Sequence, residues 1–295
     1  MRINLDGLRP WSGLAGAALA DADVVVAGIA YDGSAVYRRG AAEAPSALRT
    51  LSPVLPPVSE EGRPFQFRIH DLGDLTMPDG VEQGWPAVAS ALAAVPAGPL
   101  LSVIGGDHCA AIPVLAAQAR RHPGLMVAWI DAHPDLCDFS RGGAWTCGCA
   151  LRRGLEVAGL GPGDVVLAGC RDFDLEEVEW IKRGGALMLT AAEVGRDPVA
   201  AARTLAAAVG GRPLHISLDI DVLDPAFAPG TEVGCAGGLS TRQLLELLGT
   251  LAAGCRLVGL DVYEVSPPLD NSDITALAAL KVLFEFWGMA CRQPT

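Results

Sequence analysis

The sequence predicts an α/β fold built on a central, mainly parallel sheet. Short β-rich runs alternate with longer segments rich in Ala and Leu, which is the order expected when helices cross over between parallel strands. Hydrophobic residues make up 51% of the 295 residues, so material for a core is plentiful. No Pro- or Ser-rich linker, repeat or block of charge divides the chain, and we expect a single domain over 1–295.

Eight strands are predicted, each from a short apolar run. The runs DVVVAG, LLSVI and MVAWI, and RPLHI before Ser217, are the clearest of them. In chain order the predicted strands cover 23–28, 67–71, 99–104, 125–130, 164–169, 186–189, 214–218 and 256–262.

Seven helices are predicted in the longer Ala- and Leu-rich stretches. The segment RQLLELLGTLAAG carries signals at both ends, because Ser240 and Thr241 supply an N-cap and Gly254 a C-cap. In chain order the predicted helices cover 44–52, 85–95, 109–121, 174–184, 197–209, 240–253 and 273–290.

Charge and hydropathy narrow the class of function. The chain has 22 Lys and Arg against 34 Asp and Glu, which argues against a nucleic-acid partner and suits a cationic substrate. The longest apolar windows stop well short of the roughly 18 to 20 residues that a membrane span needs. The first residues, MRINLDGLRP, lack the pattern of a signal peptide, so we expect a cytoplasmic protein with no membrane partner. Eight cysteines occur without a CxxC pair, and we expect most to be reduced and buried.

Three short strings follow predicted strands and carry side chains that can bind metals. They are GGDHC at 105–109, DAHPD at 131–135 and SLDID at 217–221. In open parallel sheets ligands bind outside the carboxyl ends of the strands, where all three strings lie. Within DAHPD every second residue is polar, so these side chains share one face while the chain stays extended, and Asp219 and Asp221 repeat that spacing. We therefore expect the side chains to converge.

Each string alone has a structural alternative. GGDH suits a tight turn with a helix-capping aspartate, and polar residues such as those of DAHPD often cap the element after a strand. SLDIDVLDP also fits a phosphotransfer site or a plain turn before Pro225. The three strings together, each placed after a strand, favour a metal site.

The donor types indicate which ion and how many. Aspartate and histidine without thiolate suit a hard to borderline divalent ion such as Mn2+ better than structural zinc. Four carboxylates balance two divalent cations, and His108 and His133 would complete one ligand set each. The four carboxylates are Asp131, Asp135, Asp219 and Asp221.

These motifs resemble those of the ureohydrolase superfamily of arginases, agmatinases and formimidoylglutamases, which carry GGDHS, DAHxD and SxDxDxxDP in this order. The resemblance runs from about residue 23 to 285. It includes AGIAYDGSAVYRRGAAEAPSALR at 27–49, DLGDL at 71–75, AGCRDFD at 168–174 and DVYEVSPPLDNSDITALAA at 261–279.

The resemblance implies an arginase-like, three-layer αβα sandwich, assembled as a trimer or hexamer, with two Mn2+ ions per subunit. Asp131 and Asp219 would bridge the two ions. One ion would be held by His108, Asp131, Asp135 and Asp219, and the other by Asp131, His133, Asp219 and Asp221.

The resemblance also assigns residues to the substrate. Glu264 matches the family glutamate that pairs with a guanidinium, and Asp174 a position that helps arginases bind the amino end of their substrate. The structural alternative for Glu264 is a surface-loop carboxylate, and that for Asp174 is an exposed helix start.

Paired ions lower the pKa of a bound water from 15.7 to about 7. Hydroxide could then attack the guanidinium carbon, with Asp221 as the expected proton carrier.

Several residues beside the metal motifs depart from the family pattern. Cys147 stands where relatives commonly have a proton-shuttling histidine, so it either transfers protons with a different pKa or only shapes the pocket wall. Cys137 and Gly143 replace an Asn and a Ser with which arginases hold a carboxylate, and PGTEVGCAGG at 229–238 replaces the usual PGTGTPxxGG. Free L-arginine is therefore not expected as the substrate.

The sequence thus predicts a binuclear manganese hydrolase of a linear C–N bond in a guanidino compound, agmatinase-like or another amidinohydrolase that releases urea. Two alternatives stay open. One is a formimidoylglutamase-like hydrolase that releases formamide, because such enzymes often also lack that histidine. The other is a non-catalytic metal-binding homologue. Trp145 and Arg141 are candidates to line the altered substrate pocket, with ordinary packing as the alternative for Trp145.

Overall fold

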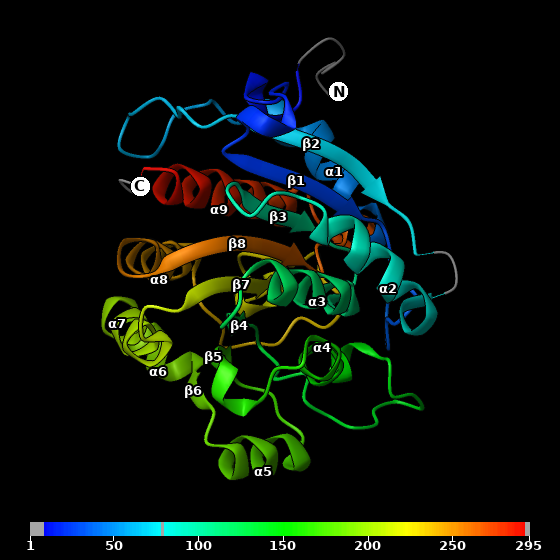
Figure 1. Ribbon diagram of the computed structural model, residues 1–295. Helices are drawn as coiled ribbons and strands as arrows, with labels where there is room; N and C mark the ends of the chain where they lie inside the picture. The colour runs from blue at the N-terminus through cyan, green and yellow to red at the C-terminus, as the bar shows by residue number, and fades with distance from the viewer. Residues whose placement is uncertain (1–8, 78–79, 293–295) are drawn as a thin grey trace.

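The computed structural model describes residues 9–77 and 80–292, in which eight strands form one sheet between two layers of helices (Figure 1). The order is β2-β1-β3-β8-β7-β4-β5-β6, and every neighbouring pair is parallel. The strands are β1 (Val24–Ile29), β2 (Ile69–Leu75), β3 (Leu100–Ile104), β4 (Met126–Ile130), β5 (Val165–Cys170), β6 (Leu187–Thr190), β7 (Pro213–Asp219) and β8 (Arg256–Tyr263). The predicted α/β class is confirmed.

The strand predictions hold within a few residues, with the largest shift at β2. This strand was predicted over 67–71 but runs over Ile69–Leu75. It forms one edge of the sheet, so much of it is partly exposed and its sequence IHDLGDL mixes polar with apolar residues. The central strands β4 and β7 are buried throughout. The sequence of β4, MVAWI, is a plain apolar run, whereas β7 also carries polar residues, of which His215 lies 2.8 Å from Asp261 Oδ2.

Helices cover both faces of the sheet. The described helices are α1 (Ala44–Leu51), α2 (Gly80–Ala93), α3 (Ala111–Arg121), α4 (Ala150–Ala158), α5 (Leu175–Gly184), α6 (Ala191–Arg196), α7 (Pro198–Val209), α8 (Thr241–Gly254) and α9 (Ile274–Ala290). The predicted N-cap of α8 is present, since the Ser240 hydroxyl accepts the Gln243 N–H. Helices α4 and α6 were not predicted.

Two apolar cores lie on opposite sides of the sheet. One contains residues of α1, α7, α8 and α9, such as Leu247 and Trp287, and the other contains residues of α2, α3, α4 and α5, such as Leu115 and Leu151. The arrangement is the expected three-layer αβα sandwich (Figure 1).

The strand order brings two of the motif strings together. Strands β4 and β7 are neighbours in the sheet, although 82 residues lie between Ile130 and Pro213 in the sequence. Their register pairs Ile130 with Leu218. Asp131 and Asp219 follow these two residues, so their carboxylates leave the sheet side by side. The third string follows β3, which is separated from β7 only by β8. All three strings therefore meet at the carboxyl edge of the sheet.

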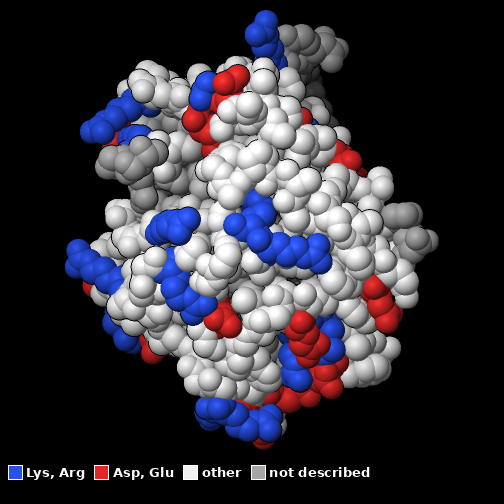
Figure 2. Space-filling view, in the orientation of Figure 1, with Lys and Arg blue, Asp and Glu red and all other residues white. Residues whose placement is uncertain are grey.

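The distribution of charge differs between surface and interior. On the face in Figure 2, basic and acidic side chains are interspersed with uncharged surface. Inside the described part of the chain, ten Asp and Glu side chains are buried but no Lys or Arg side chain is. No helix in 9–77 or 80–292 is long and apolar enough to cross a bilayer.

Candidate metal centre

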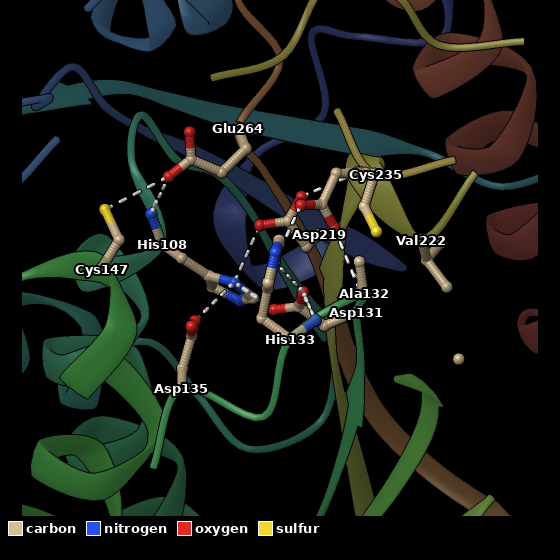
Figure 3. A network of polar contacts seen from close by, with 12 residues as sticks. His108, Asp131, Ala132, His133, Asp135, Cys147, Asp219, Val222, Cys235 and Glu264 are labelled. Atoms are coloured by element: carbon tan, nitrogen blue, oxygen red, sulfur yellow. Dashed lines mark hydrogen bonds and ion pairs between the residues drawn. The ribbon is translucent and has the colours of Figure 1, made fainter. Parts of the chain in front are cut away.

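Backbone turns after β4 and β7 fix three carboxylates. The His133 N–H donates to Asp131 Oδ1 at 2.7 Å, and the Asp221 N–H donates to Asp219 Oδ1 at 2.8 Å. The two turns are joined where the Ala132 N–H donates to Asp221 Oδ1 at 3.1 Å (Figure 3). One oxygen of each carboxylate thus accepts a hydrogen bond from a backbone N–H, and the other oxygen can point toward an ion.

The glycines of GGDHC let the chain approach its neighbours closely enough to place His108. A Cβ on Gly106 would lie 1.8 Å from the Tyr31 carbonyl oxygen, and one on Gly105 would meet the Tyr263 ring at 2.1 Å. Asp107 then accepts the Cys109 N–H at 3.1 Å, as a capping residue does. The structural interpretation of GGDH as a capped turn is therefore correct, and the turn also serves the site.

His108 is held by contacts on several sides. Its ring stacks on Trp129 with centroids 3.8 Å apart, and Nε2 lies 3.0 Å from the Ser217 hydroxyl. Donation from Nε2 leaves Nδ1 as the lone-pair nitrogen, the tautomer that suits a metal ligand. Nδ1 lies 3.0 Å from Asp131 Oδ2 and 3.1 Å from Asp219 Oδ2. Asp135 Oδ2 is 3.5 Å from the same nitrogen. These four side chains form the first cluster.

A second cluster surrounds His133. Its Nδ1 lies 3.1 Å from Asp221 Oδ2 and 3.5 Å from Asp131 Oδ1. Although burial disfavours a charged imidazole, the carboxylates of Asp221 and Asp131 raise the pKa of His133 to about 12. Asp131 offers an oxygen to each cluster. Asp219 contributes to the first cluster, so of the two bridging residues expected, Asp131 is the one that both clusters contain.

The two clusters fit a pair of divalent cations. His108 Nδ1 and Asp131 Oδ2 are buried and face each other, yet neither has a hydrogen-bond partner among the described residues. Burial, together with neighbouring carboxylates, raises the pKa of Asp135 and of Asp219 well above the usual range. Cations bound among these oxygens would offset that repulsion. The donor set, all nitrogen and oxygen, suits Mn2+.

A cavity of about 220 Å³ opens onto these clusters. The walls include Arg141 and Cys147, as well as the acidic residues Asp174, Glu232 and Glu264. Acidic side chains on several sides of one small cavity favour a cationic occupant.

Glu264 is a buried carboxylate on the wall of this cavity. It is 4% exposed, and its backbone φ of 60° lies in the left-handed region that a glutamate rarely adopts. Oε1 accepts the His108 N–H at 2.8 Å, whereas Oε2 has no hydrogen-bond partner among the described residues. Cys147 Sγ lies 3.5 Å from Oε1 (Figure 3). The surface-loop alternative for Glu264 does not hold.

The remaining predicted residues take different places. Asp174 begins α5 as its N-cap, as the helix-start interpretation expects, and it also lines the cavity, where its contact with a substrate stays a prediction. Cys137 is buried, and its thiol donates to Asp174 Oδ2 at 3.4 Å. Trp145 packs against the core that contains α3 and α4 and is not among the described residues lining the cavity. Packing, rather than substrate contact, is the role that its position supports.

Three further residues shape the site without having been singled out from the sequence. Ser217 orients His108 as described above, and Arg171 donates to the carbonyls of Asp221 at 2.7 Å and Cys235 at 2.6 Å. Arg171 thereby holds the segment after β7. Glu232 adds a buried carboxylate to the cavity wall, and the departure PGTEVG from the usual PGTGTP was its only sequence signal.

A parallel α/β sandwich that presents linked His and Asp clusters at the carboxyl edge of its sheet defines a class of metal-binding hydrolases. The chain belongs to the arginase family, whose pattern matches residues 22–288. Members of this ureohydrolase family hydrolyse C–N bonds in linear amidines.

Individual relatives agree with this assignment. The proclavaminate amidinohydrolase of Streptomyces clavuligerus is 35% identical over 268 residues, covering 88% of this chain and 85% of the relative. Its solved structure matches with a TM-score of 0.88 over 98% of both chains. An agmatinase of Bacillus anthracis is 31% identical over 90% of this chain and 91% of the relative. The formimidoylglutamase of Bacillus subtilis, at 23% identity and a TM-score of 0.89 over 100% and 96% of the two chains, shares the fold.

Proposed function

We propose that this protein hydrolyses the linear C–N bond of a guanidino compound other than L-arginine and releases urea, using two Mn2+ ions. The observation that carries the proposal is the pair of clusters sharing Asp131 beside Glu264, whose buried Oε2 lacks a partner. The ligands would be those predicted from the sequence, namely His108, Asp131, His133, Asp135, Asp219 and Asp221.

Relatives support the guanidino group as the part of the substrate that reacts. The relatives above 30% identity include an amidinohydrolase and agmatinases, whereas the formimidoylglutamase shares only the fold at 23% identity. The tail of the substrate is less constrained. The Cys137 thiol is hydrogen-bonded to Asp174, and Gly143 has no side chain. Neither residue therefore supplies the polar contacts that would hold an amino-acid carboxylate. An L-arginine substrate is therefore disfavoured.

The chain's own residues would bind and orient the substrate. When bound, the paired ions would lower the pKa of a nucleophilic water and would also place positive charge beside the reacting carbon. Glu264 Oε2 would accept hydrogen bonds from the guanidinium, while the His108 N–H keeps the carboxylate in place. Asp221 lines the cavity and would pass a proton to the leaving nitrogen.

The function is tested by identifying the product. Purified protein loaded with Mn2+ is incubated with a panel of guanidino compounds and with formiminoglutamate, and urea and formamide are measured separately. Urea from at least one guanidino compound is expected. Formamide as the only product would favour the formimidoylglutamase-like alternative, and absence of both products from the metal-loaded protein would favour a non-catalytic homologue.

The ligand assignment has its own test. Asp131→Asn should lower the Mn2+ content and activity together, because both clusters lose an oxygen ligand. Asp21→Asn is the control, since Asp21 is exposed beside the start of β1 and far from the carboxyl edge of the sheet. Unchanged metal content in the Asp131 variant, measured by elemental analysis, would contradict the assignment.

We also propose that the chain acts as one domain, because strands from both ends of the sequence share a single sheet. A homo-oligomer, trimer or hexamer, is expected from the family. Light scattering on the purified protein measures that assembly directly.

A further inference from the structure

Glu232 lies close to Glu264 on the wall of the cavity. One carboxylate oxygen of each lies within 4.8 Å of the other and of Cys147 Sγ. Both side chains are 4% exposed. Two carboxylates this close and this buried repel each other unless a cation lies between them. The single S–H of Cys147 can satisfy only one acceptor at a time, at 3.5 Å from Glu264 Oε1 or 3.9 Å from Glu232 Oε2.

The separation of the two carboxylates is fixed by the surrounding backbone. Glu232 Oε1 accepts the Tyr37 N–H, and the Arg38 guanidinium donates to the Glu232 carbonyl at 2.8 Å. The loops that carry the two glutamates are hydrogen-bonded directly, since the Ser266 N–H donates to the Gly230 carbonyl at 2.7 Å. The pair is therefore a preorganised acceptor and not two mobile side chains.

We propose that Glu232 determines specificity by hydrogen bonding to the substrate guanidinium. Glu264 binds one part of this cation, and Glu232 accepts a hydrogen bond from the terminal amino group that Glu264 does not bind. A guanidino group ends in two NH2 groups, whereas a formimino group has a C–H in place of one of them. Glu264, with an unpartnered Oε2, binds one edge of the planar cation. Glu232 binds the next edge and meets the C–H of a formimino group with no hydrogen bond.

This inference deepens the proposed function and rests on it for the identity of the reacting group. Formimino compounds are excluded because they leave the buried Glu232 carboxylate without a hydrogen-bond donor. Because hydrogen bonds between charged groups are the stronger ones, the preference is expected to be at least tenfold.

The test compares two small cations that differ in the same way. The dissociation constants of guanidinium chloride and formamidinium chloride are measured by calorimetry on the Mn2+-loaded protein at constant ionic strength. Wild type should bind guanidinium at least tenfold more tightly. Glu232→Gln should lose most of that preference while keeping its two metal ions. Glu246→Gln, which removes the same charge at an exposed position on α8, should behave as wild type.

Glu232→Asp provides a second variant that retains a carboxylate, and it should keep a preference between those of wild type and Glu232→Gln. Equal affinity of wild type for the two cations, or an unchanged preference in Glu232→Gln, would overturn the inference. A third bound metal ion per subunit that is lost in Glu232→Gln would also overturn it, since the cluster would then be a metal site. Urea release tests the proposed function separately, because cation preference is measured without turnover.

Discussion

Replacing Ser217 with alanine should weaken binding of the ion that we propose His108 to ligate. Ser217 and His108 are 0% and 1% exposed, and the hydroxyl is 3.0 Å from Nε2. Removal of the hydroxyl leaves a buried N–H without its partner, which costs about 1–3 kcal/mol. Since about 1.4 kcal/mol corresponds to a factor of ten, the expected loss in Mn2+ affinity is roughly 10- to 100-fold. Titration of metal-depleted protein with buffered Mn2+ measures it, with the ion at the His133 cluster binding nearly as before.

Ser102→Ala is the matched control for this variant. Ser102 is equally buried, lies on β3 and accepts the Trp287 indole N–H at 3.1 Å. Its loss should lower the melting temperature without changing Mn2+ affinity, because no metal ligand contacts it in the described structure. If Ser217→Ala leaves both Mn2+ affinities unchanged, or if both serine variants weaken them equally, the orienting role of Ser217 is refuted.

Two further predictions concern titration. Burial, with Arg121 and Arg256 nearby, lowers the pKa of His122 from 6.5 to about 4. Between these values the unfolded chain binds the proton first, so stability falls as pH drops from 6.5 to 4, and His122→Gln should remove up to roughly 3 kcal/mol of that loss in urea unfolding. Contact with Cys109, and burial, raise the pKa of Cys147 well above 9.0. Cys147→His should therefore add a titration near pH 6.5 to the profile of kcat/KM, and an unchanged profile would exclude proton transfer at this position.

The layer architecture and the clustering of the candidate metal ligands could be predicted because their signals are local. A strand buried on both faces, such as β4, is an apolar run, and the candidate ligands follow strands at short, fixed spacings. Helix α4 was missed because Gly154 in its middle looks like a helix breaker. The structure requires that glycine, since a Cβ there would lie 2.7 Å from Leu115 Cδ1 on α3. Helix α6 has only six residues, which is too short for a helical period to be visible.

The roles of Ser217 and Glu232 depend on contacts between distant segments. Ser217 lies 109 residues from His108. It begins the string SLDID, but the sequence does not show that its hydroxyl faces the His108 ring. Glu232 becomes a cavity residue only because the loop at Tyr37 and Arg38 packs against it. The altered string PGTEVG marked the position as unusual, but the carboxylate's closeness to Glu264 emerges only in three dimensions.

The place of β7 in the sheet has a consequence for the order of assembly during synthesis. Without β7 and β8 the sheet consists of two separate halves, β2-β1-β3 and β4-β5-β6. A nascent chain that has not yet reached residue 213 therefore has no continuous sheet, and Asp131 and His133 stand at an open strand edge without Asp219 and Asp221. The last two strands join the halves and complete both metal clusters in the same event. Binding of the proposed ions would therefore depend on this closing step of folding.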